Sequence, residues 1–327
     1  MTDEVVASVL DNPAGLHLGG EERKVTMLMS DLRGFTSFAE RITPTQVVAF
    51  LNRYLETMVN VIMAYHGTIE ALLGDGLFVL FGAPLGHETD APRAVACAVA
   101  MQLAMDEVNA QNHREGLPDV EMGIGIHTGN VVVGNIGSQK HMKYAAVGNH
   151  VNLTSRIESY TTGNQILISE TTRDEVGPVL RLDGQMQVEP KGVQEALTLY
   201  EVGGIGAPYN LLLPEQHDTF VSLDSALDLR YMVLEEKHVS STVFTGRLVK
   251  LSANGGVIHS DNHVPAWSNI KIWFTDSNGV EIPGDLYGKV VAHPMESAPC
   301  FTVRFTSRAP EVTTFLQGVF PSFSLVS

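Results

Sequence analysis

The sequence predicts an α+β protein with a mainly antiparallel sheet, followed by a smaller, β-barrel-like domain. Strand-like and helix-like segments alternate in the first two-thirds of the chain, whereas short strands separated by Asn-Gly and Pro-Gly turns fill the last third. A stretch that contains Gly and Pro lies between these regions. Because 327 residues exceed one ordinary domain, two domains are expected.

Two of the predicted strand regions place an aspartate at a strand end. The segment 24–30 alternates in the manner of a strand, and Asp31 follows it. The segment 67–82 is typical of two apolar strands joined by a tight turn, because Asp75 and the glycine after it form a strong hairpin signal. Two carboxylates that converge across adjacent strands can bind hard divalent cations such as Mg²⁺ or Mn²⁺.

The first long helix is predicted from its start signals. Thr43 supplies an N-cap, Pro44 a first-turn proline and Gln46 a capping-box partner. Gly67 can end the helix. Its apolar stripe comprises Val47, Leu51, Tyr54, Leu55, Met58 and Ile62.

Three further elements complete the first part. An alanine-rich helix is expected over 90–112, and its apolar residues on most sides indicate burial. Strands are expected at 120–129 and at 130–137. The short helix that follows carries Asn152 and Arg156 at positions i and i+4, so both side chains project from one face.

The last part reads as a set of short strands flanked by helix-like segments. Strands are predicted at 242–252, 269–276, 286–294 and 301–307, with helix-like flanks near 219–234 and 310–318. The predicted boundaries are 1–21 for an N-terminal extension, 22–203 for the first domain, 204–216 for a linker and 217–327 for the second domain.

Composition excludes several classes of function. A formal net charge of −16 disfavours binding to DNA or RNA, which relies on clustered Lys and Arg. A membrane span is not expected, since no apolar stretch approaches about 20 residues. The first residues carry acids and do not resemble a signal peptide, so the protein is expected to be cytoplasmic. Cys97 and Cys300 lie far apart and are expected to be reduced thiols.

Five motifs occur in order along the first domain: SDLRGFTSF, LLGDGLFVLFG, GIGIHTGNVVVGNIGS, YAAVGNHVNLTSRIE and a PKG followed by EALTLYEV. Together they resemble the successive motifs of class III adenylyl and guanylyl cyclases. The resemblance covers residues 22–203 and implies a ferredoxin-like cyclase domain. It also implies an enzyme that converts a nucleoside triphosphate to the 3′,5′-cyclic nucleotide and pyrophosphate.

The resemblance assigns roles to individual residues. Asp31 and Asp75 match the metal aspartates, and the carbonyl of Leu32 matches a backbone metal ligand. Two Mg²⁺ or Mn²⁺ ions per site are implied. Asn152 matches a residue that orients the ribose, and Arg156 matches one that stabilises charge on the α-phosphate. The phosphate-binding positions are the backbone amides of Gly34, Phe35 and Thr36, together with the Lys191 side chain.

The same resemblance implies an obligate homodimer with two sites, because Asn, Arg and Lys of one subunit reach the metals of the other. Structural readings of the single residues remain open at this stage. Asn152 could be a first-turn helix residue, Arg156 part of a solvated helix face, and Lys191 a turn lysine. The joint spacing of the motifs favours the functional reading.

The base pocket departs from the family pattern. Ala71 and Ala145 stand where adenylyl and guanylyl cyclases place the residues that read a purine. Such soluble enzymes with a small C-terminal module resemble the pyrimidine cyclases of Pycsar antiphage defence, which make cyclic UMP or cyclic CMP for a downstream effector. Tyr144 and Asn149 are candidate base readers, whereas Glu70 would face away from Ala71 on a regular strand.

The segment KLSANGG resembles the turn of PilZ domains, with Ser252 and Gly255 in matching places. Lys250 stands in place of an Asp or Asn, and Leu234 in place of the second arginine after Arg230. A degenerate PilZ-like sensor is therefore expected. Three functions remain open: a pyrimidine cyclase, a purine cyclase with unusual base contacts, and a catalytically silent nucleotide-binding or ligand-binding module.

Overall fold

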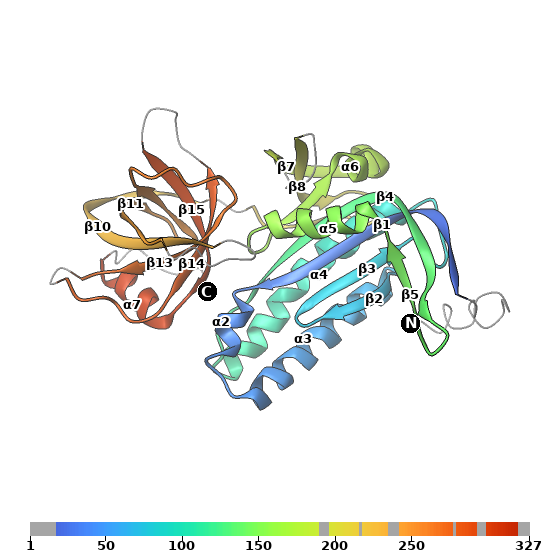
Figure 1. Cartoon of the computed structure of the whole chain (residues 1–327), viewed down its shortest axis with the longest axis horizontal. Coiled ribbons are helices and arrows are strands. Elements are labelled where there is room, and N and C mark those ends of the chain that lie inside the picture. Colours follow the sequence, from blue (N-terminus) through green and yellow to red (C-terminus); the bar gives the residue numbers. More distant parts are fainter. Residues whose placement is uncertain are drawn as a thin grey trace. The chain divides into compact units, whose positions relative to one another are not determined.

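The computed structural model describes residues 18–189, 196–215, 218–234, 242–276, 279–292 and 299–319. The chain divides into two compact units, Met1–Glu215 and Gln216–Ser327 (Figure 1). Both contain a sheet, but only the first combines its sheet with several long helices. The predicted α+β domain and the predicted barrel therefore occur in the expected order.

The first unit contains nine described strands and five described α-helices. The strands are β1 (Gly19–Arg33), β2 (Thr68–Leu73), β3 (Gly76–Phe81), β4 (Glu121–Ser138), β5 (His141–Val147), β6 (Ile166–Ser169), β7 (Leu180–Val188), β8 (Leu197–Ile205) and β9 (Leu211–Leu212). The helices are α2 (Phe35–Ala39), α3 (Pro44–Ala64), α4 (Asp90–Arg114), α5 (Asn149–Tyr160) and α6 (Glu170–Val176), with a 3₁₀ turn, η2 (Gly177–Val179), after α6.

The sheet of the first unit has the order β2-β3-β1-β4-β6-β8-β7, with β5 paired to β4 and β9 to β8. Every pairing is antiparallel except that of β4 with β6, which confirms the mainly antiparallel sheet. The expectation of two strands at 120–129 and 130–137 is wrong, because these residues form the single strand β4. β1 pairs with β4 along its whole length, from Gly19 opposite Asn135 to Arg33 opposite Glu121.

The two faces of this sheet are covered differently. α3 and α4 lie beside each other and pack on one face, where Leu28 and Leu32 of β1 join Ile124 and Ile126 of β4 in the main core (Figure 1). Alternate residues of the same strands, Val25, Met27, Val131 and Val133 among them, form a second cluster on the opposite face. α5 lies along β1 and β4 on that opposite face.

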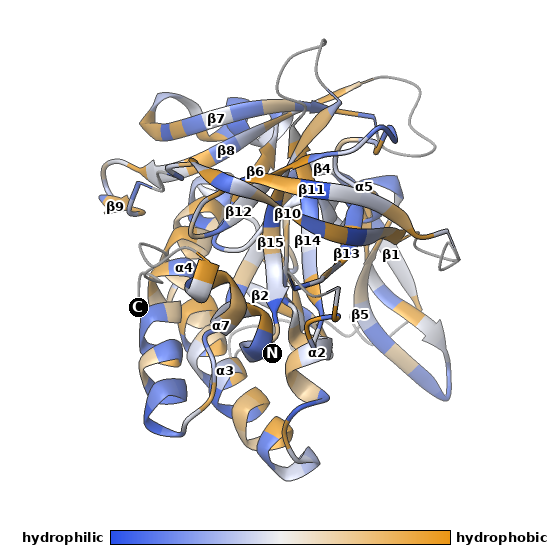
Figure 2. Ribbon diagram, turned by 90° about the vertical axis from the view of Figure 1, so that its left-hand side faces the viewer, coloured by the Kyte–Doolittle hydropathy of each residue, from blue (hydrophilic) through white to orange (hydrophobic). Residues whose placement is uncertain are grey.

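The predicted start of α3 is confirmed in detail. The Thr43 side chain accepts a hydrogen bond from the Gln46 backbone, and the Gln46 side chain accepts one from the Thr43 backbone. Phe50, Tyr54, Met58 and Ile62 form its buried side. By length and composition, α3 is the one described helix that is long and apolar enough to cross a membrane, which corrects the expectation of no such stretch. Figure 2 shows hydrophobic and hydrophilic residues mixed along it, as in a helix with one buried side.

The predicted linker 204–216 is corrected by the structure. Its first residues complete β8, and β9 pairs with β8 through Gly204 and Leu212. Leu211 and Leu213 pack against the main core of the first unit. Pairing to an existing strand orders this Gly- and Pro-containing stretch, so the first unit continues to Glu215.

The second unit is a closed barrel of six strands in the order β10-β11-β12-β15-β14-β13. The strands are β10 (Val221–Leu234), β11 (Phe244–Leu251), β12 (Gly255–His259), β13 (Asn269–Phe274), β14 (Leu286–Ala292) and β15 (Cys300–Arg308), followed by helix α7 (Pro310–Val319). The helix expected near 310–318 is thus confirmed. The helix-like flank near 219–234 is wrong, because it forms β10, whose pairing with both β11 and β13 closes the barrel.

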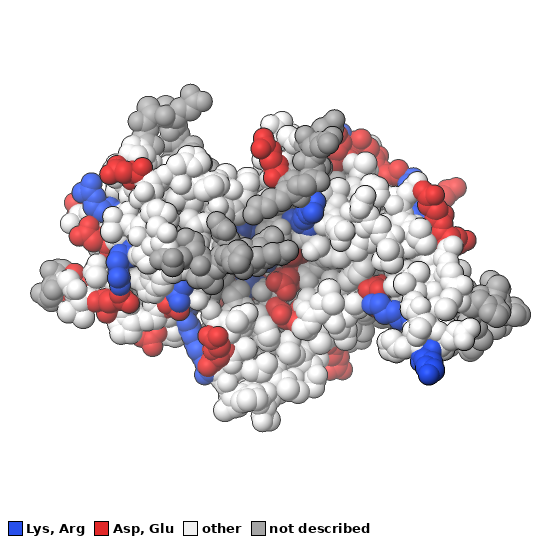
Figure 3. All heavy atoms as spheres, viewed as in Figure 1, with Lys and Arg blue, Asp and Glu red and all other residues white. Residues whose placement is uncertain are grey.

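The charged surface and the thiols agree with the sequence. On the face in Figure 3, Lys and Arg lie in separate small groups among Asp and Glu, without a continuous basic stripe over the described residues. Cys97 is buried in the first unit, Cys300 is half-buried in the second, and both are free thiols.

Candidate active site

Asp31 and Asp75 meet where β1 ends and the β2–β3 hairpin turns. The two carboxyl groups are close enough for each to influence the pKa of the other, and the Asp75 Oδ2 accepts a hydrogen bond from the Leu32 amide at 3.3 Å. The register of β1 against β3, with Ser30 opposite Leu77, places the strand end beside the hairpin tip. The structure therefore brings together the two carboxylates that the sequence proposed as metal ligands.

Burial controls the charge of this pair. Burial, and then the neighbouring Asp31 carboxylate, raise the pKa of Asp75 to about 6. Burial also raises the pKa of Asp31, against the opposing effect of the Arg33 guanidinium. Two carboxylates held together in this way repel each other when both are ionised, so they need a shared proton or a bound cation.

The donor set suits a hard divalent cation. Two carboxylates and the adjacent Leu32 carbonyl are oxygen ligands of the kind that Mg²⁺ and Mn²⁺ take, with further oxygens normally coming from water or substrate phosphates. In the part of the chain that the structure describes, no group of three or more His, Cys, Asp or Glu side chains could hold a metal ion. A cation at Asp31 and Asp75 would thus take its remaining ligands from backbone carbonyl, water or phosphate oxygens.

The predicted phosphate-binding amides lie directly after these aspartates. Gly34 adopts a left-handed conformation, with φ of 68°, and leads into α2. No side chain caps the first amides of this helix, which include those of Phe35 and Thr36. The Phe35 ring packs against Phe38 and Phe50, with ring centroids 5.9 and 6.0 Å apart, and anchors the turn.

Asn152 and Arg156 lie on the outward face of α5. Asn152 is exposed and Arg156 is half-buried, whereas Thr154 and Ile157 on the same helix are buried. Among the described residues, neither the Asn152 nor the Arg156 side chain forms a hydrogen bond or ion pair. Both side chains are available to a substrate or to another subunit.

Glycines on β4 determine how closely α5 approaches the sheet. Gly123, Gly125 and Gly129 lie on the side of β4 that faces the helix. A Cβ atom on Gly125 would lie 2.3 Å from the Glu158 amide nitrogen, and one on Gly129 would lie 2.5 Å from the His150 ring. The glycines of the motif GIGIHTG thus let α5 pack closely on β4, a role that the strand pattern alone did not reveal.

The start of α5 rests on a pair of histidines, of which His127 is buried and His150 is half-buried. His127 Nε2 lies 2.7 Å from His150 Nδ1, and its Nδ1 lies 2.8 Å from the Ser169 hydroxyl. Burial, and then the neighbouring His150, lower the pKa of His127 to about 4. His127 is therefore neutral at pH 7. Sequence reasoning missed this pair, although both histidines fall within its quoted motifs.

The end of α5 is held by Arg33, a second group that sequence reasoning missed. Its guanidinium forms an ion pair with Glu158 and donates to the Thr161 hydroxyl at 2.6 Å. It also lies 3.6 Å from the Asp31 carboxylate. The residue follows Asp31 by two positions, so a charge next to a proposed metal ligand was the available signal.

The candidate base-pocket residues are only partly brought together. Ala71 and Tyr144 pack in the same cluster on the α5 face. Ala145 is buried one position along β5, and Asn149 is exposed at the start of α5. Because successive strand residues point to opposite faces, Ala145 lies on the other side of β5 from Tyr144.

Glu70 differs from its expectation on a regular strand. The β2–β3 register shifts between Ile69 and Ala71, which leaves Glu70 as the extra residue of a bulge. Its carboxylate accepts from Lys143 of β5 at 2.8 Å, and its side chain is 6% exposed. The bulge therefore turns a buried carboxylate toward β5, the strand that carries Tyr144.

Other predicted positions lie outside this site. Lys191 falls outside the described residues. In the barrel, the Ser252 hydroxyl donates to the Gly255 carbonyl within the β11–β12 turn, and Arg230 forms an ion pair with Glu281. The turn that was predicted to be PilZ-like is thus closed by its own hydrogen bond.

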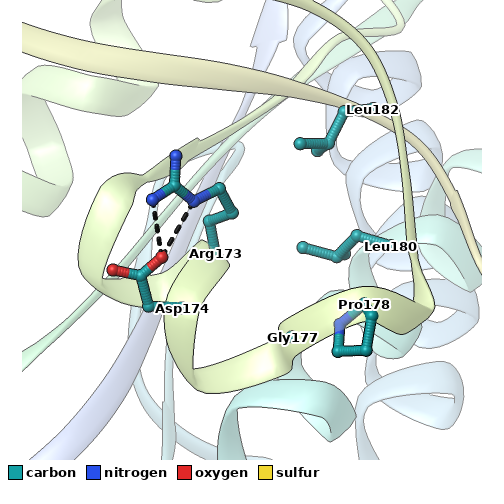
Figure 4. Close-up of a pocket in the computed structure, with 6 residues that line it drawn as sticks. All are labelled: Arg173, Asp174, Gly177, Pro178, Leu180 and Leu182. Carbon is teal, nitrogen blue, oxygen red and sulfur yellow. Dashed lines mark hydrogen bonds and ion pairs between the residues drawn. The ribbon is translucent and has the colours of Figure 1, made fainter.

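A pocket of about 370 Å³ lies over α6, η2 and β7. Figure 4 shows Arg173 turned toward Asp174, opposite Leu180 and Leu182. The guanidinium donates to Asp174 at 2.6 and 2.9 Å, so its charge is already neutralised. None of the predicted site residues lines this pocket.

Comparison with known proteins agrees with this geometry. Residues 20–201 match the family described as Adenylate and Guanylate cyclase catalytic domain. The chain is 54% identical to the guanylyl cyclase Cya2, with a TM-score of 0.59 and coverage of 60% of this chain and 100% of that one. It is 34% identical to the adenylyl cyclase CyaB from P. aeruginosa, with a TM-score of 0.55 and coverage of 57% of this chain and 96% of that one.

A curated relative, Adenylate cyclase 1 of Rhizobium meliloti (strain 1021), is 32% identical over 194 residues, which cover 58% of this chain and 29% of that protein. The chain therefore spans less than a third of the length of this relative. The family match covers more than half of the chain, and the site geometry lies within it. The chain belongs to the family of adenylate and guanylate cyclase catalytic domains.

Proposed function

We propose that the chain is a nucleotidyl cyclase, which closes a nucleoside triphosphate to its 3′,5′-cyclic nucleotide and releases pyrophosphate. The observation that carries the proposal is the convergence of Asp31 and Asp75 beside the uncapped amides after Gly34. Oxygen ligands and backbone amides next to each other fit a metal-bound triphosphate. The strand order β2-β3-β1-β4, with α3 and α4 on one face, supports the proposed ferredoxin-like core.

The chain's own residues bind and orient the substrate. Asp31, Asp75 and the Leu32 carbonyl would hold two divalent cations, and the amides of Gly34, Phe35 and Thr36 would bind phosphate oxygens. When bound, Mg²⁺ or Mn²⁺ lowers the pKa of the ribose 3′-hydroxyl and neutralises phosphate charge. The remaining rate depends on holding the 3′-hydroxyl in line with the α-phosphate.

Asn152 and Arg156 complete the site from a second subunit in this proposal. Asn152 would orient the ribose, and Arg156 would stabilise negative charge that develops on the α-phosphate. Their lack of partners among the described residues supports this role. Exposed apolar residues of β2, β4 and β5 support a homodimer, since such surface is normally buried in an assembly; they include Leu72, Leu73, Val132, Ile136, Met142 and Val147.

GTP is the substrate that we favour. Guanine presents N–H donors at N1 and N2, and a carboxylate can accept from both, whereas adenine and cytosine offer one amino group. Glu70 supplies a buried carboxylate beside Ala71, and its partner Lys143 is 57% exposed and therefore weakly bound. The 54% identity to a guanylyl cyclase supports the same choice.

The pyrimidine and antiphage predictions gain no support from the relatives, which are named as adenylyl or guanylyl cyclases. Alanines at positions 71 and 145 occupy less space than the longer side chains that read a purine in the family, which suits a purine at least as well as a smaller base. A downstream effector of the cyclic nucleotide and a cytoplasmic location remain part of the proposal. The barrel is proposed to be a PilZ-like regulatory module, supported by its closed six-stranded form.

One assay tests substrate and chemistry together. Purified protein is incubated separately with ATP, GTP, CTP and UTP in Mn²⁺, and cyclic products are identified by mass spectrometry. We expect cyclic GMP as the main product, and Glu70→Gln should lower kcat/KM for GTP relative to ATP by about 10–100-fold. Cyclic UMP or CMP would restore the pyrimidine prediction, and no product from any triphosphate would favour a silent binding module.

The role of the barrel is tested by removal. A chain that ends at Glu215 retains the whole first unit, so it should fold and keep the metal-dependent activity. A regulatory barrel predicts a changed kcat in this shortened chain, whereas a purely stabilising barrel predicts a lower unfolding temperature at unchanged kcat. Binding of cyclic di-GMP to the full chain, measured by calorimetry, is not expected because Arg230 is paired with Glu281.

A further inference from the structure

Arg33 connects the metal-ligand end of β1 with the last turn of α5. One guanidinium nitrogen, Nη1, lies 3.6 Å from the Asp31 carboxylate. The other, Nη2, contacts the Glu158 carboxylate, donates to the Glu158 carbonyl at 3.2 Å and donates to the Thr161 hydroxyl at 2.6 Å. A single planar group thus touches both elements at once.

The contact between Arg33 and Glu158 is largely buried and closely packed. The Arg33 side chain is 12% exposed and that of Glu158 is 14% exposed. Gly123 of β4 faces this contact, and a Cβ atom there would fall 2.1 Å from Arg33 Nη2 and 2.0 Å from the Thr161 hydroxyl. Gly123 pairs with Asp31 across the sheet. The chain therefore leaves room at this position for the guanidinium to pass over β4.

The same contact suits the end of a helix. The carbonyls of the last turn of α5 carry partial negative charge, so a cation there is favourable. Arg33 supplies that cation from another strand, and the Thr161 hydroxyl donates to the Glu158 carbonyl at 2.7 Å. Because α5 is a single helix from Asn149 to Tyr160, fixing its last turn fixes the outward face that carries Asn152 and Arg156.

We propose that Arg33 is a positioning residue that links the two active sites of the dimer through one chain. This inference rests on the proposed function, in which the aspartates of a chain serve one site and its Asn152 and Arg156 serve the other. Arg33 lies between these two sets. Arg33 is a counter-ion of both Asp31 and Glu158. A cation that binds Asp31 competes with Arg33 for the Asp31 carboxylate, and so changes how Arg33 holds α5.

A mixed dimer separates the two roles. One chain carries Asp75→Asn and the other Asn152→Ala, so that a single intact site remains, with metal ligands from the second chain and Asn152 from the first. Arg33→Lys is then placed in one chain or in the other. Lysine keeps the charge but cannot span Asp31, Glu158 and Thr161 as the guanidinium fork does.

We expect a larger loss when Arg33→Lys lies in the chain that supplies Asn152. There kcat should fall by about 10–100-fold with little change in KM, because a small displacement of a catalytic group is costly. In the chain that supplies the aspartates, the main change should be in the Mn²⁺ concentration needed for half-maximal rate. Glu158→Gln in the chain that supplies Asn152 should reproduce part of the loss in kcat.

Arg93 provides a matched control. It forms an ion pair with Asp90 at similar burial, 10% and 16% exposed, and donates to backbone carbonyls, but it lies on α4. Arg93→Lys should have the same effect in either chain. If the loss of kcat caused by Arg33→Lys is the same in either chain, and no larger than the loss caused by Arg93→Lys, Arg33 is only structural and the inference fails. A parent mixed dimer without activity would overturn the shared-site arrangement and this inference with it.

Discussion

The two units bury polar groups in different ways. In the first unit, Thr26, His127, Thr128, Ser169 and Thr172 form a connected buried network around the start of α6. In the barrel, the described buried polar groups are few, and the Ser260 hydroxyl lies 2.9 Å from the Tyr231 hydroxyl and donates to the Thr245 carbonyl at 3.0 Å. Buried polar groups are costly unless they are satisfied.

The difference shows where buried groups fix the position of the structure in addition to stabilising it. A network of hydrogen bonds gives one orientation, whereas apolar packing tolerates small shifts. His127 joins this network to His150 at the start of α5, the helix that carries Asn152 and Arg156, whereas the barrel core is mainly apolar, with Tyr231, Phe274 and Phe301 buried. Substitutions of the partly exposed site residues in the first unit should therefore change activity at small cost in stability, and those in the barrel core the reverse.

The largest expected effect is on catalysis. Asp75→Ala or Arg156→Ala should lower kcat by about 10³-fold or more, because each removes charge stabilisation of the reacting phosphate. The unfolding temperature should change little, since both side chains are partly exposed. Product formation and thermal unfolding measured on the same samples test this; a variant with wild-type turnover would refute the site.

The barrel should show the opposite pattern. Phe274 is 1% exposed and packs against Phe315 with ring centroids 5.7 Å apart. Phe274→Ala should lower the unfolding free energy of the barrel by about 3–5 kcal/mol. Hydrogen exchange should report faster exchange of amides in β13 and β14, while β1 and β4 keep their protection. Equal loss of protection in both units would contradict the division into two cores.

Acid should weaken the network of the first unit. The pKa of His127 is about 4 in the fold, below the ordinary value, so the unfolded chain binds the proton more strongly. The stabilisation is fully present above pH 6.5 and is lost as pH falls toward 4. By pH 5 the loss is about 2 kcal/mol. Urea unfolding of wild type and His127→Gln at pH 7.5 and 5 tests this, and an identical acid dependence of the two would exclude His127 as the cause.

The smallest expected effect is on the stability of the metal-free protein, through the ionisation of Asp75. Folding raises the pKa of Asp75 to about 6, so ionised Asp75 destabilises the metal-free fold as pH rises from about 4 to 6. Asp75→Asn should stabilise the chelator-treated protein by about 1 kcal/mol at pH 8, after allowance for solvent screening. The gain should vanish near pH 4. Wild type that equals Asp75→Asn at pH 8 in chelator would show that the carboxylates do not repel.

Local patterns predicted much of the first unit. The capping box at Thr43, the turn at Asp75 and the outward pair on α5 depend on residues within a few positions of one another, so local chemistry determines them. The ordered motifs pointed to the cyclase family, and the family match over residues 20–201 confirms it. The roles of the individual site residues and the base preference stay predictions.

Other features depended on partners far away in the chain. Residues 219–234 became a strand because β11 and β13 pair with them, and 211–212 became a strand because β8 does. Arg33 meets Glu158 across 125 positions. The bulge that turns Glu70 exists only in the register of β2 against β3.

By itself the sequence determined the family, the order of most elements, and the two carboxylates at the ends of strands. Only the tertiary structure decided how α5 is held, with a hydrogen-bonded histidine pair at its start and Arg33 at its end. The physical reason is the separation along the chain of the groups that interact. Propensity and turn chemistry act between near neighbours, whereas burial and charge pairing depend on which distant groups the fold brings within a few ångströms.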